Sequence, residues 1–404
     1  MSEKSPMFTP PVPFREMIFH RHTLRSIAWL ELYYDLIYVA TFIQIGNFLS
    51  KHVEWGGFGQ FLLLIAVTWW SWSGTTLFYN RYVADDWLHR VLVFMQMSSV
   101  AVLGISVSHA FSDLTLQFTL AYVLTRLVLV LMYLRTARVH PATARFSIDY
   151  AVAFGVGAIL WIGALFLPAE YRWIGWAVAI LIEFILPNLP HMLAHQHLVT
   201  LDPHHLEERL GIFTMIVLGE GFVKVLDVAQ GTAFSIDQFW FSVFGLAITF
   251  GLWWLYFTDT MDHGVEVEKT GALRLWFYGH LPLAAGLVTF AVAAKKLYSA
   301  TLEHPGEALP AEYRLLYTAG LAMYLLALVM IDIGTHHGNR QADNIQLGTR
   351  LLSIVAIVIL GIFATEFDAT RLVMSLAVIF VFQIGVSVWL HTRMNFAVPH
   401  YHHE

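Results

Sequence analysis

Long apolar windows follow one another along the chain, separated by short polar connections. Each window covers about 20 residues, which is enough for a helix to cross a hydrocarbon core about 30 Å thick. The windows are continuously apolar rather than alternating, so helices are expected and not barrel strands. The predicted fold class is all-α, a polytopic transmembrane helical bundle. We predict twelve transmembrane helices, at residues 29–50, 58–80, 88–110, 114–135, 147–167, 171–189, 209–228, 237–259, 272–295, 312–333, 350–366 and 371–392.

Composition supports a lipid bilayer as the solvent of this chain. Of the 404 residues, 57% are hydrophobic and only 13% are charged, whereas soluble proteins have roughly a quarter charged. The net charge of -6 comes with no long basic or acidic run, so nucleic acid is not indicated as a partner. The sequence has no cysteine, which excludes disulfides, thiolate metal sites and cysteine nucleophiles.

The basic residues predict the orientation of the chain. Lys and Arg outside the predicted spans are more numerous on the side that would hold the N-terminus. The positive-inside rule therefore places both termini in the cytoplasm, and we expect a multi-pass protein of a bacterial cytoplasmic (inner) membrane.

The two halves of the chain share features at nearly constant offsets, which predicts an internal duplication. Trp69-Trp70 matches Trp253-Trp254 at an offset of 184 residues. Six helices per half would give two parallel-related six-helix repeats, as in some secondary transporters. Chance agreement between two apolar stretches is the alternative. The expected organisation is a cytoplasmic N-terminal segment (1–28), a first repeat (29–190), a His-rich cytoplasmic connection (191–208), a second repeat (209–392) and a cytoplasmic tail (393–404).

The first predicted span carries a stripe of polar side chains. Glu31, Asp35 and Tyr38 are spaced four and three residues apart and so share one helix face, and Gln44 continues the trail. Charged groups inside a bilayer are costly and usually face a cavity or a partner. The stripe indicates a wetted path, although the two carboxylates could instead cap the start of the helix.

The seventh predicted span contains Glu220 between two glycines. Gly219 and Gly221 would permit close backbone approach or a local break in the helix. A desolvated carboxylate in such a place is a candidate for taking up and releasing protons. Lys224, one turn later, could instead neutralise Glu220 as a structural ion pair.

Further polar groups fall inside other predicted spans. Arg126 needs a carboxylate, and Glu183 is a matching partner, either as a structural salt bridge or with the arginine free to bind an anion. At the offset of 184, Gln96 matches His280, which is either a satisfied core histidine or a proton relay. We include all four in a candidate substrate and proton pathway.

Histidines and acidic residues give weak candidates for a metal site, and no cofactor is predicted. His191 and His195 have the i, i+4 spacing of two imidazole ligands on one helix. Asp259, Asp262 and His263 form a second group at the end of the eighth span, where a solvated helix end is the alternative. A matching pattern such as His-Glu-x-x-His is missing from both.

Several of these motifs resemble the bacterial low temperature requirement A (LtrA) family. Residues 30–39, Leu-Glu-Leu-Tyr-Tyr-Asp-Leu-Ile-Tyr-Val, are similar to the family's Leu-Glu-Leu-Phe-Phe-Asp-Leu-Val-Phe-Val opening. Residues 208–211 leading to 218–220 resemble its Glu-Arg-x-Gly to Leu-Gly-Glu motif, and Tyr278-x-His280 resembles its Tyr-x-His. The chain differs in having tyrosines in the opening and Gly221 where the family commonly has Ser. The resemblance implies a multi-span membrane protein.

Together these features favour a proton-coupled secondary transporter of a small molecule over an enzyme. No phosphate-cradling loop or nucleophile elbow occurs, which argues against ATP-driven transport by this chain and against hydrolase chemistry. The alternatives are an intramembrane metal- or haem-dependent enzyme and a ligand-sensing membrane-stress protein. The expected partners are the lipid bilayer, a small-molecule substrate and protons. Whether copies of the chain form a homo-oligomer stays open.

Overall fold

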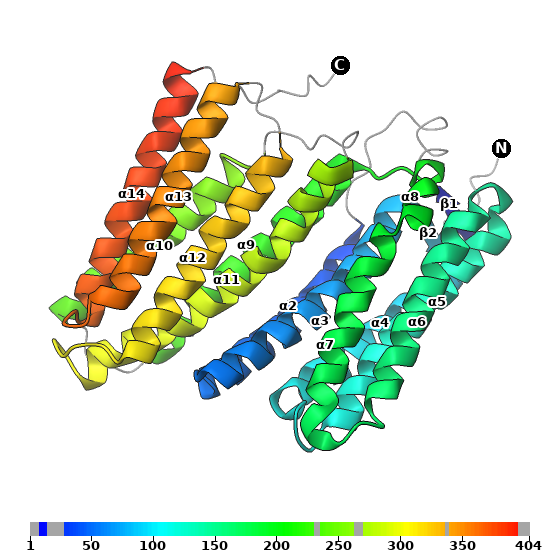
Figure 1. The fold of residues 1–404 in the computed structure, drawn as a ribbon, viewed down its shortest axis with the longest axis horizontal. Coiled ribbons are helices and arrows are strands. Elements are labelled where there is room, and N and C mark those ends of the chain that lie inside the picture. The colour runs from blue at the N-terminus through cyan, green and yellow to red at the C-terminus, as the bar shows by residue number, and fades with distance from the viewer. Residues whose placement is uncertain (1–7, 14–27, 230–234, 262–269, 336–338, 395–404) are drawn as a thin grey trace. The chain divides into compact units, whose positions relative to one another are not determined.

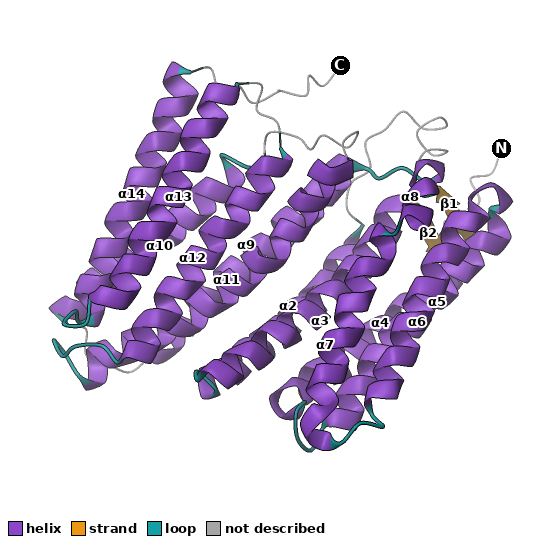
Figure 2. Cartoon of the chain, in the orientation of Figure 1, coloured by secondary structure: helices purple, strands orange, loops and turns teal. Residues whose placement is uncertain are grey.

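The structure is a computed structural model, and it describes residues 8–13, 28–229, 235–261, 270–335 and 339–394. Helices dominate these residues (Figure 2). The chain divides into two compact units. The first unit comprises Met1–Phe48 and Gly59–Arg209, and the second comprises Leu49–Phe58 and Leu210–Glu404.

The first unit contains the elements from β1 to α8, apart from the last residues of α2 and the first residues of α3. It also contains the first turns of α9 (Figure 1). The longer elements are β1 (Phe8–Pro13), α2 (Trp29–Lys51), α3 (Trp55–Arg81), β2 (Tyr82–Asp86), α4 (Trp87–Ser106), α5 (Thr115–Val139), α6 (Ala144–Ala164), α7 (Arg172–Ile185) and α8 (Pro190–Ala194). Short 3-10 helices occupy the turns: η1 (Val107–His109), η2 (Pro141–Thr143), η3 (Ala169–Tyr171), η4 (Leu186–Asn188) and η5 (Gln196–Leu198).

The second unit is built from long helices. They are the greater part of α9 (Pro203–Ala229), then α10 (Ile236–Phe257), α11 (Thr270–Glu303), α12 (Ala311–Gly334), α13 (Arg340–Phe363) and α14 (Ala369–Arg393). Helix α10 starts with a capping box in which Ser235 and Gln238 satisfy each other's backbone N–H groups.

Ten helices among the described residues are long and apolar enough to cross a membrane. They coincide with the second to sixth and the eighth to twelfth predicted spans. The first and seventh predicted spans fall on α2 and α9, which are long enough but carry charged side chains such as Asp35 and Glu220. The protein is therefore a helical membrane protein with many apolar spans, and the full count of twelve and the repeat remain predictions.

Some helices extend several residues beyond the predicted spans. Helix α13 begins at Arg340, ten residues before the predicted start of the eleventh span at 350, so Arg350 lies within a helix. The segment 191–208, expected to be a connection, contains part of α8, all of η5 and the first turns of α9. In both places, helical turns with polar residues adjoin an apolar window. A boundary drawn from hydropathy alone therefore excludes these turns from the helix.

Helices α11 and α12 pack at close range through glycines. A Cβ atom added at Gly286 would lie 2.8 Å from the backbone N of Tyr324, and one added at Gly320 would lie 2.7 Å from the backbone N of Phe290. Small residues of this kind let two membrane helices bring their backbones together. The backbones of α11 and α12 thus approach each other closely at these glycines.

A two-stranded antiparallel sheet, which the sequence did not predict, lies beside the start of α4. Strand β1 pairs with β2 so that Phe8 is opposite Asp86 and Pro13 is opposite Tyr82. Asp86 also caps α4, because its Oδ1 accepts the backbone N–H of His89 at 2.7 Å, and it forms an ion pair with Arg135. Burial acts to raise the pKa of Asp86, but the hydrogen bonds from Arg135 and His89 outweigh it and hold that pKa below its ordinary value.

Candidate functional site

Two carboxylates of α2 face one arginine of α9 inside the first unit. Arg209 Nη1 lies 3.3 Å from Glu31 Oε2, and Arg209 Nε donates to Asp35 Oδ2 at 3.3 Å. A second guanidinium nitrogen of Arg209 also donates to Asp35 Oδ1. Arg209 and Asp35 are fully buried and Glu31 is 3% exposed, so this ionic group is shielded from water.

A buried histidine completes the group. His205 precedes Arg209 by one turn of α9, and its Nε2 lies 3.0 Å from Glu31 Oε2. Its Nδ1 lies 3.4 Å from the amide nitrogen of Asn80 on α3, and that amide also donates to the backbone carbonyl of Asp202 at 2.7 Å. We call Glu31, Asp35, His205 and Arg209 the Arg209 cluster.

Aromatic side chains of α3 enclose the Arg209 cluster. Trp72 Nε1 donates to Asp35 Oδ1 at 2.7 Å. The guanidinium carbon of Arg209 lies 5.8 Å from the ring centroid of Trp72 and 5.6 Å from that of Tyr79, which are cation–π distances. The aromatic rings exclude water and so strengthen the electrostatic interactions inside the cluster.

The Arg209 cluster brings two carboxylates, one guanidinium and one imidazole together in a buried site. Charged groups in such a site are stabilised by close partners of opposite charge and by hydrogen bonds. His205 Nε2 and Glu31 Oε2 lie within hydrogen-bond distance of each other. Ionisable groups held in contact in this way are typical of sites that bind and release protons.

Three successive residues of α3 connect the Arg209 cluster with a second buried group. Trp72 binds Asp35 as described, the Ser71 hydroxyl donates to Thr125 Oγ1 at 3.1 Å, and Trp70 Nε1 donates to Glu183 Oε2 at 3.1 Å. Successive helical residues point about 100° apart. Helix α3 thus makes polar contacts on three sides, with α2, α5 and α7.

The second group is the Arg126 cluster, formed by Arg126, Glu183 and Tyr122. Arg126 Nε lies 2.9 Å from Glu183 Oε2, which is the ion pair expected from the sequence. The Tyr122 hydroxyl lies 3.1 and 3.0 Å from the two carboxylate oxygens. One positive and one negative charge leave this cluster neutral, so it shows no demand for a further proton or anion.

Tyr38 and Gln96 belong to the polar region around these two clusters. The Tyr38 hydroxyl shares a 2.9 Å hydrogen bond with Ser71 Oγ. Gln96 Nε2 donates to Thr75 Oγ1 at 3.1 Å and to the backbone carbonyl of Thr125 at 3.4 Å. Both side chains are buried, whereas Gln44, which the sequence placed on the same polar trail, is exposed and contacts only Asn47 among the interactions described.

The second unit has an ionic group of its own, centred on Arg350. Arg350 forms an ion pair with Asp332 and lies 3.7 Å from Asp259 Oδ2. The Ser387 hydroxyl donates to Asp259 Oδ1 at 2.5 Å and accepts from Trp254 Nε1 at 2.9 Å. Asp259, a weak metal candidate from the sequence, is therefore engaged by an arginine. Asp262 and His263 lie outside the described residues.

The predicted role of Glu220 receives less support from the geometry than that of the Arg209 cluster. Its carboxylate lies 3.3 Å from Lys224 Nζ and its side chain is 18% exposed. Helix α9 continues unbroken past Gly219 and Gly221, so the expected helix break is absent there. The other expectation, close approach, is met at Gly221, where an added Cβ would lie 3.3 Å from the Cβ of Ala291.

His280 occupies a buried position in α11 with both ring nitrogens hydrogen-bonded. Its Nδ1 lies 2.9 Å from the Trp276 carbonyl oxygen, and its Nε2 lies 3.1 Å from the Tyr256 hydroxyl. This is the arrangement of a satisfied core histidine, one of the two alternatives that the sequence left open.

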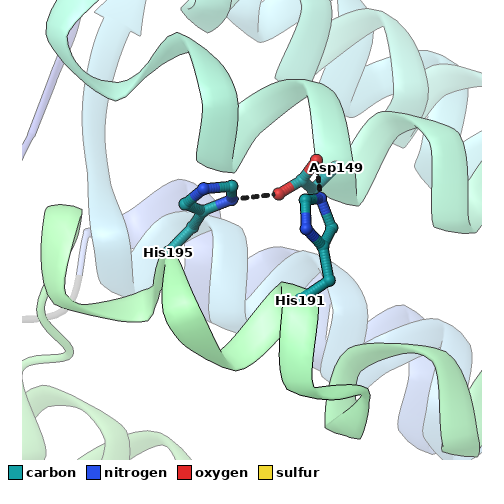
Figure 3. A group of neighbouring side chains, drawn as sticks. All are labelled: Asp149, His191 and His195. Atoms are coloured by element: carbon teal, nitrogen blue, oxygen red, sulfur yellow. Dashed lines mark hydrogen bonds and ion pairs between the residues drawn. The ribbon is translucent and has the colours of Figure 1, made fainter.

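The side chains of His191 and His195 both point toward Asp149 of α6 (Figure 3). His191 Nε2 lies 3.3 Å from Asp149 Oδ1, and His195 Nδ1 lies 2.6 Å from Asp149 Oδ2. The sequence predicted the two imidazoles but not the carboxylate, which is 42 residues away from His191 along the chain.

Sequence reasoning gave no role in a site to Arg209, Arg350 or Asp149, and it considered His205 only as one of the histidines close to His191 and His195. One signal could have found Arg209 and His205: they are four residues apart on a helix, like Glu31 and Asp35, so each pair shares a helix face. No comparable signal connects Asp149 with His191, because only the packing of α6 against α8 brings them together.

These observations define a multi-pass helical membrane protein with buried ionic clusters. The sequence matches the family of the bacterial low temperature requirement A protein (LtrA) over residues 26–389, and the chain belongs to this family. It is also 27% identical over 297 residues to an uncharacterized protein of Rhizobium meliloti (strain 1021), an alignment that covers 68% of this chain and 71% of that protein. The family match includes the residues of the Arg209 cluster.

Proposed function

We propose that the protein is a proton-coupled secondary transporter of a small molecule, with the Arg209 cluster as its proton-binding site. The observation that carries the proposal is a fully buried arginine between two carboxylates, with a histidine in contact with one of them. A group of ionisable side chains changes its net charge when it binds one proton. Such a change is what couples protonation to a conformational step.

The position of the cluster fits this role. Its members lie on α2 and on the first turns of α9, the two long helices that are outside the set of ten apolar spans. Ionisable residues within membrane helices are rare and are concentrated on ion and substrate pathways. The neutral Arg126 cluster of the same unit has balanced charges and is better explained as a structural connection between helices.

The proposal moves the proton site away from Glu220, which is paired with Lys224. It keeps Glu31 and Asp35, and it adds His205 and Arg209. The second unit also holds one arginine with two carboxylates, at Arg350, but on α13, on α12 and just after α10, which are not the helices that a parallel repeat would match with α2 and α9.

The test is a proton-flux measurement in proteoliposomes loaded with a fluorescent pH indicator. Divalent metals, inorganic anions, amines, nucleosides and amphiphiles are added outside, one class at a time, at pH 5.5 and 7.5. We expect one class to change the internal pH. Glu31→Gln should abolish that change, because an amide does not bind and release a proton as a carboxylate does. Glu220→Gln should leave at least half of it.

The control is Glu170→Gln, which removes an exposed carboxylate and should not alter the flux. Each variant is first shown to be folded and inserted, by size-exclusion chromatography and by its thermal unfolding. The proposal is wrong if no class moves protons, or if Glu31→Gln and His205→Gln both keep the wild-type proton flux.

A metal- or haem-dependent enzyme within the membrane is the second candidate function. His280, the buried histidine that could have served as an axial ligand, already has a hydrogen-bond partner at each ring nitrogen. The residues that favour a metal instead are Asp149 of α6 and the pair His191 and His195 at α8.

A further inference from the structure

We infer that Asp149, His191 and His195 form a binding site for one divalent transition-metal ion, with Zn²⁺ as the reference ion. We call these three residues the histidine site. It is separate from the Arg209 cluster and does not depend on the proposed transport function.

The local fold brings the three side chains together. Pro190 starts the short helix α8, where a proline is accommodated because the first N–H of a helix has no intrahelical partner. His191 then lies in its first turn and His195 is its C-terminal capping residue, so both rings are on one side of one helical turn. Asp149, in the second turn of α6, faces that side (Figure 3).

The ligand atoms have the spacing that a metal ion needs. One atom from each residue can be chosen so that all three lie within 4.8 Å of one another. In a tetrahedral zinc site with bonds of about 2.0–2.1 Å, neighbouring ligand atoms are about 3.3 Å apart. The 3.3 Å between His191 Nε2 and Asp149 Oδ1 already matches this value. His195 Nδ1 lies 2.6 Å from the other carboxylate oxygen, Oδ2, so a modest movement of the Asp149 carboxylate or of the ring would bring all three ligands around one ion.

The ligand types also fit. Two imidazoles and one carboxylate are a donor set for zinc and for other borderline first-row metals, whereas Mg²⁺ and Ca²⁺ prefer oxygen ligands throughout. Within the described part of the chain, the ion pairs of Asp149 are made with these two imidazoles and not with Lys or Arg. Among the residues that the structure describes, the carboxylate is thus not neutralised by a permanent cation.

The site is open on one side. The His191 side chain is 72% exposed, whereas those of His195 and Asp149 are 20% and 17% exposed. A metal ion could enter from water past His191 and keep a water molecule as its fourth ligand, as metal sites with three protein ligands do. Bound metal would then fasten α8 to α6.

The binding experiment uses the full-length protein purified in detergent with a tag that contains no histidine. His400, His402 and His403 near the C-terminus are replaced by Ala in every sample, because a histidine-rich tail binds metals by itself. Zn²⁺ is titrated by calorimetry, and Co²⁺ is titrated while its visible absorption is recorded, since intense bands identify a tetrahedral ion. We expect one equivalent of either ion to bind.

Two variants and one control test the assignment. His195→Ala and Asp149→Asn should each weaken binding of Zn²⁺ by at least about tenfold and abolish the tetrahedral Co²⁺ spectrum. His197→Ala removes an exposed imidazole of η5 that is not part of the site, and binding should be unchanged. His191→Ala serves as a further variant that should preserve folding, because its exposed side chain contributes little to packing.

Saturable binding of one ion that is lost in the two ligand variants and kept in the control supports the site. Loss of binding in His197→Ala to the same extent, or retention of the tetrahedral spectrum in Asp149→Asn, would overturn it. Absence of stoichiometric binding to the parent protein would overturn it as well. None of these outcomes involves proton flux, so the result is independent of the transport proposal.

Discussion

Replacement of Arg209 by Gln would leave two carboxylates of α2 facing each other in a buried site. Glu31 and Asp35 each lose a charged partner, and the Asp35 carboxylate loses the two hydrogen bonds that Arg209 donates. Removing one partner of a buried ion pair costs about 3–5 kcal/mol, because the remaining charge stays desolvated. We therefore expect the free energy of unfolding to fall by about that amount.

The loss of stability in Arg209→Gln should be larger at high pH than at low pH. In Arg209→Gln the repulsion disappears when either carboxylate takes up a proton, so the deficit relative to wild type should be larger at pH 8 than at pH 5.5. The assay is reversible unfolding in mixed detergent micelles at both pH values. Arg138→Gln, which alters an exposed arginine near the end of α5, should change the stability by less than about 0.5 kcal/mol.

A rescue variant separates charge from packing. When Arg209→Gln is combined with Glu31→Gln and Asp35→Asn, the two carboxylates are removed together with the arginine, and at least half of the lost stability should return. If the triple variant is no more stable than Arg209→Gln, the arginine stabilises the unit through its contacts with Trp72 and Tyr79. The electrostatic reasoning would then be refuted.

Two further substitutions test other parts of the first unit. Because the pKa of Asp86 is held below its unfolded value of about 3.9, ionised Asp86 stabilises the fold above that value, and its contribution is lost as the pH falls through the lower folded pKa. Asp86→Asn should thus lower the free energy of unfolding by about 1–2 kcal/mol at pH 7 and by less at pH 3, measured by unfolding at both pH values. Gly157→Ala should cost about 1–3 kcal/mol, because the new Cβ would lie 2.6 Å from Glu183 Cδ, whereas Gly155→Ala meets no atom within 4 Å and should be neutral or slightly stabilising in the same assay.

Most of the fold follows from hydropathy, and much less of the candidate site does. Apolar windows locate ten spans because helix length and bilayer thickness are both fixed by simple geometry. The ion pair between Arg126 and Glu183 was also predictable, since a charge deep in the membrane needs an opposite charge. Arg209 was not recognised, because an arginine near the start of a span looks like an ordinary cytoplasmic anchor.

The remaining site residues depend on tertiary contacts that a single sequence does not encode visibly. Asp149 joins His191 and His195 only because α6 and α8 lie side by side, and nothing in the spacing of 42 residues indicates it. His280 is the opposite case. Its position inside a predicted span made it a candidate proton relay, but in the structure both of its ring nitrogens have ordinary hydrogen-bond partners. Pattern and composition therefore locate polar residues better than they assign their partners.

The three consecutive contacts of α3 restrict how the first unit can move. A rotation of α3 about its axis, or a slide of one residue, would displace Trp70, Ser71 and Trp72 from Glu183, Thr125 and Asp35 at the same time. A rigid movement of the helix therefore has to break all three hydrogen bonds together, whereas rotation of one side chain breaks only its own. Any motion that changes the Arg209 cluster must carry α3 along with its neighbours or pull α2 away from them as a whole.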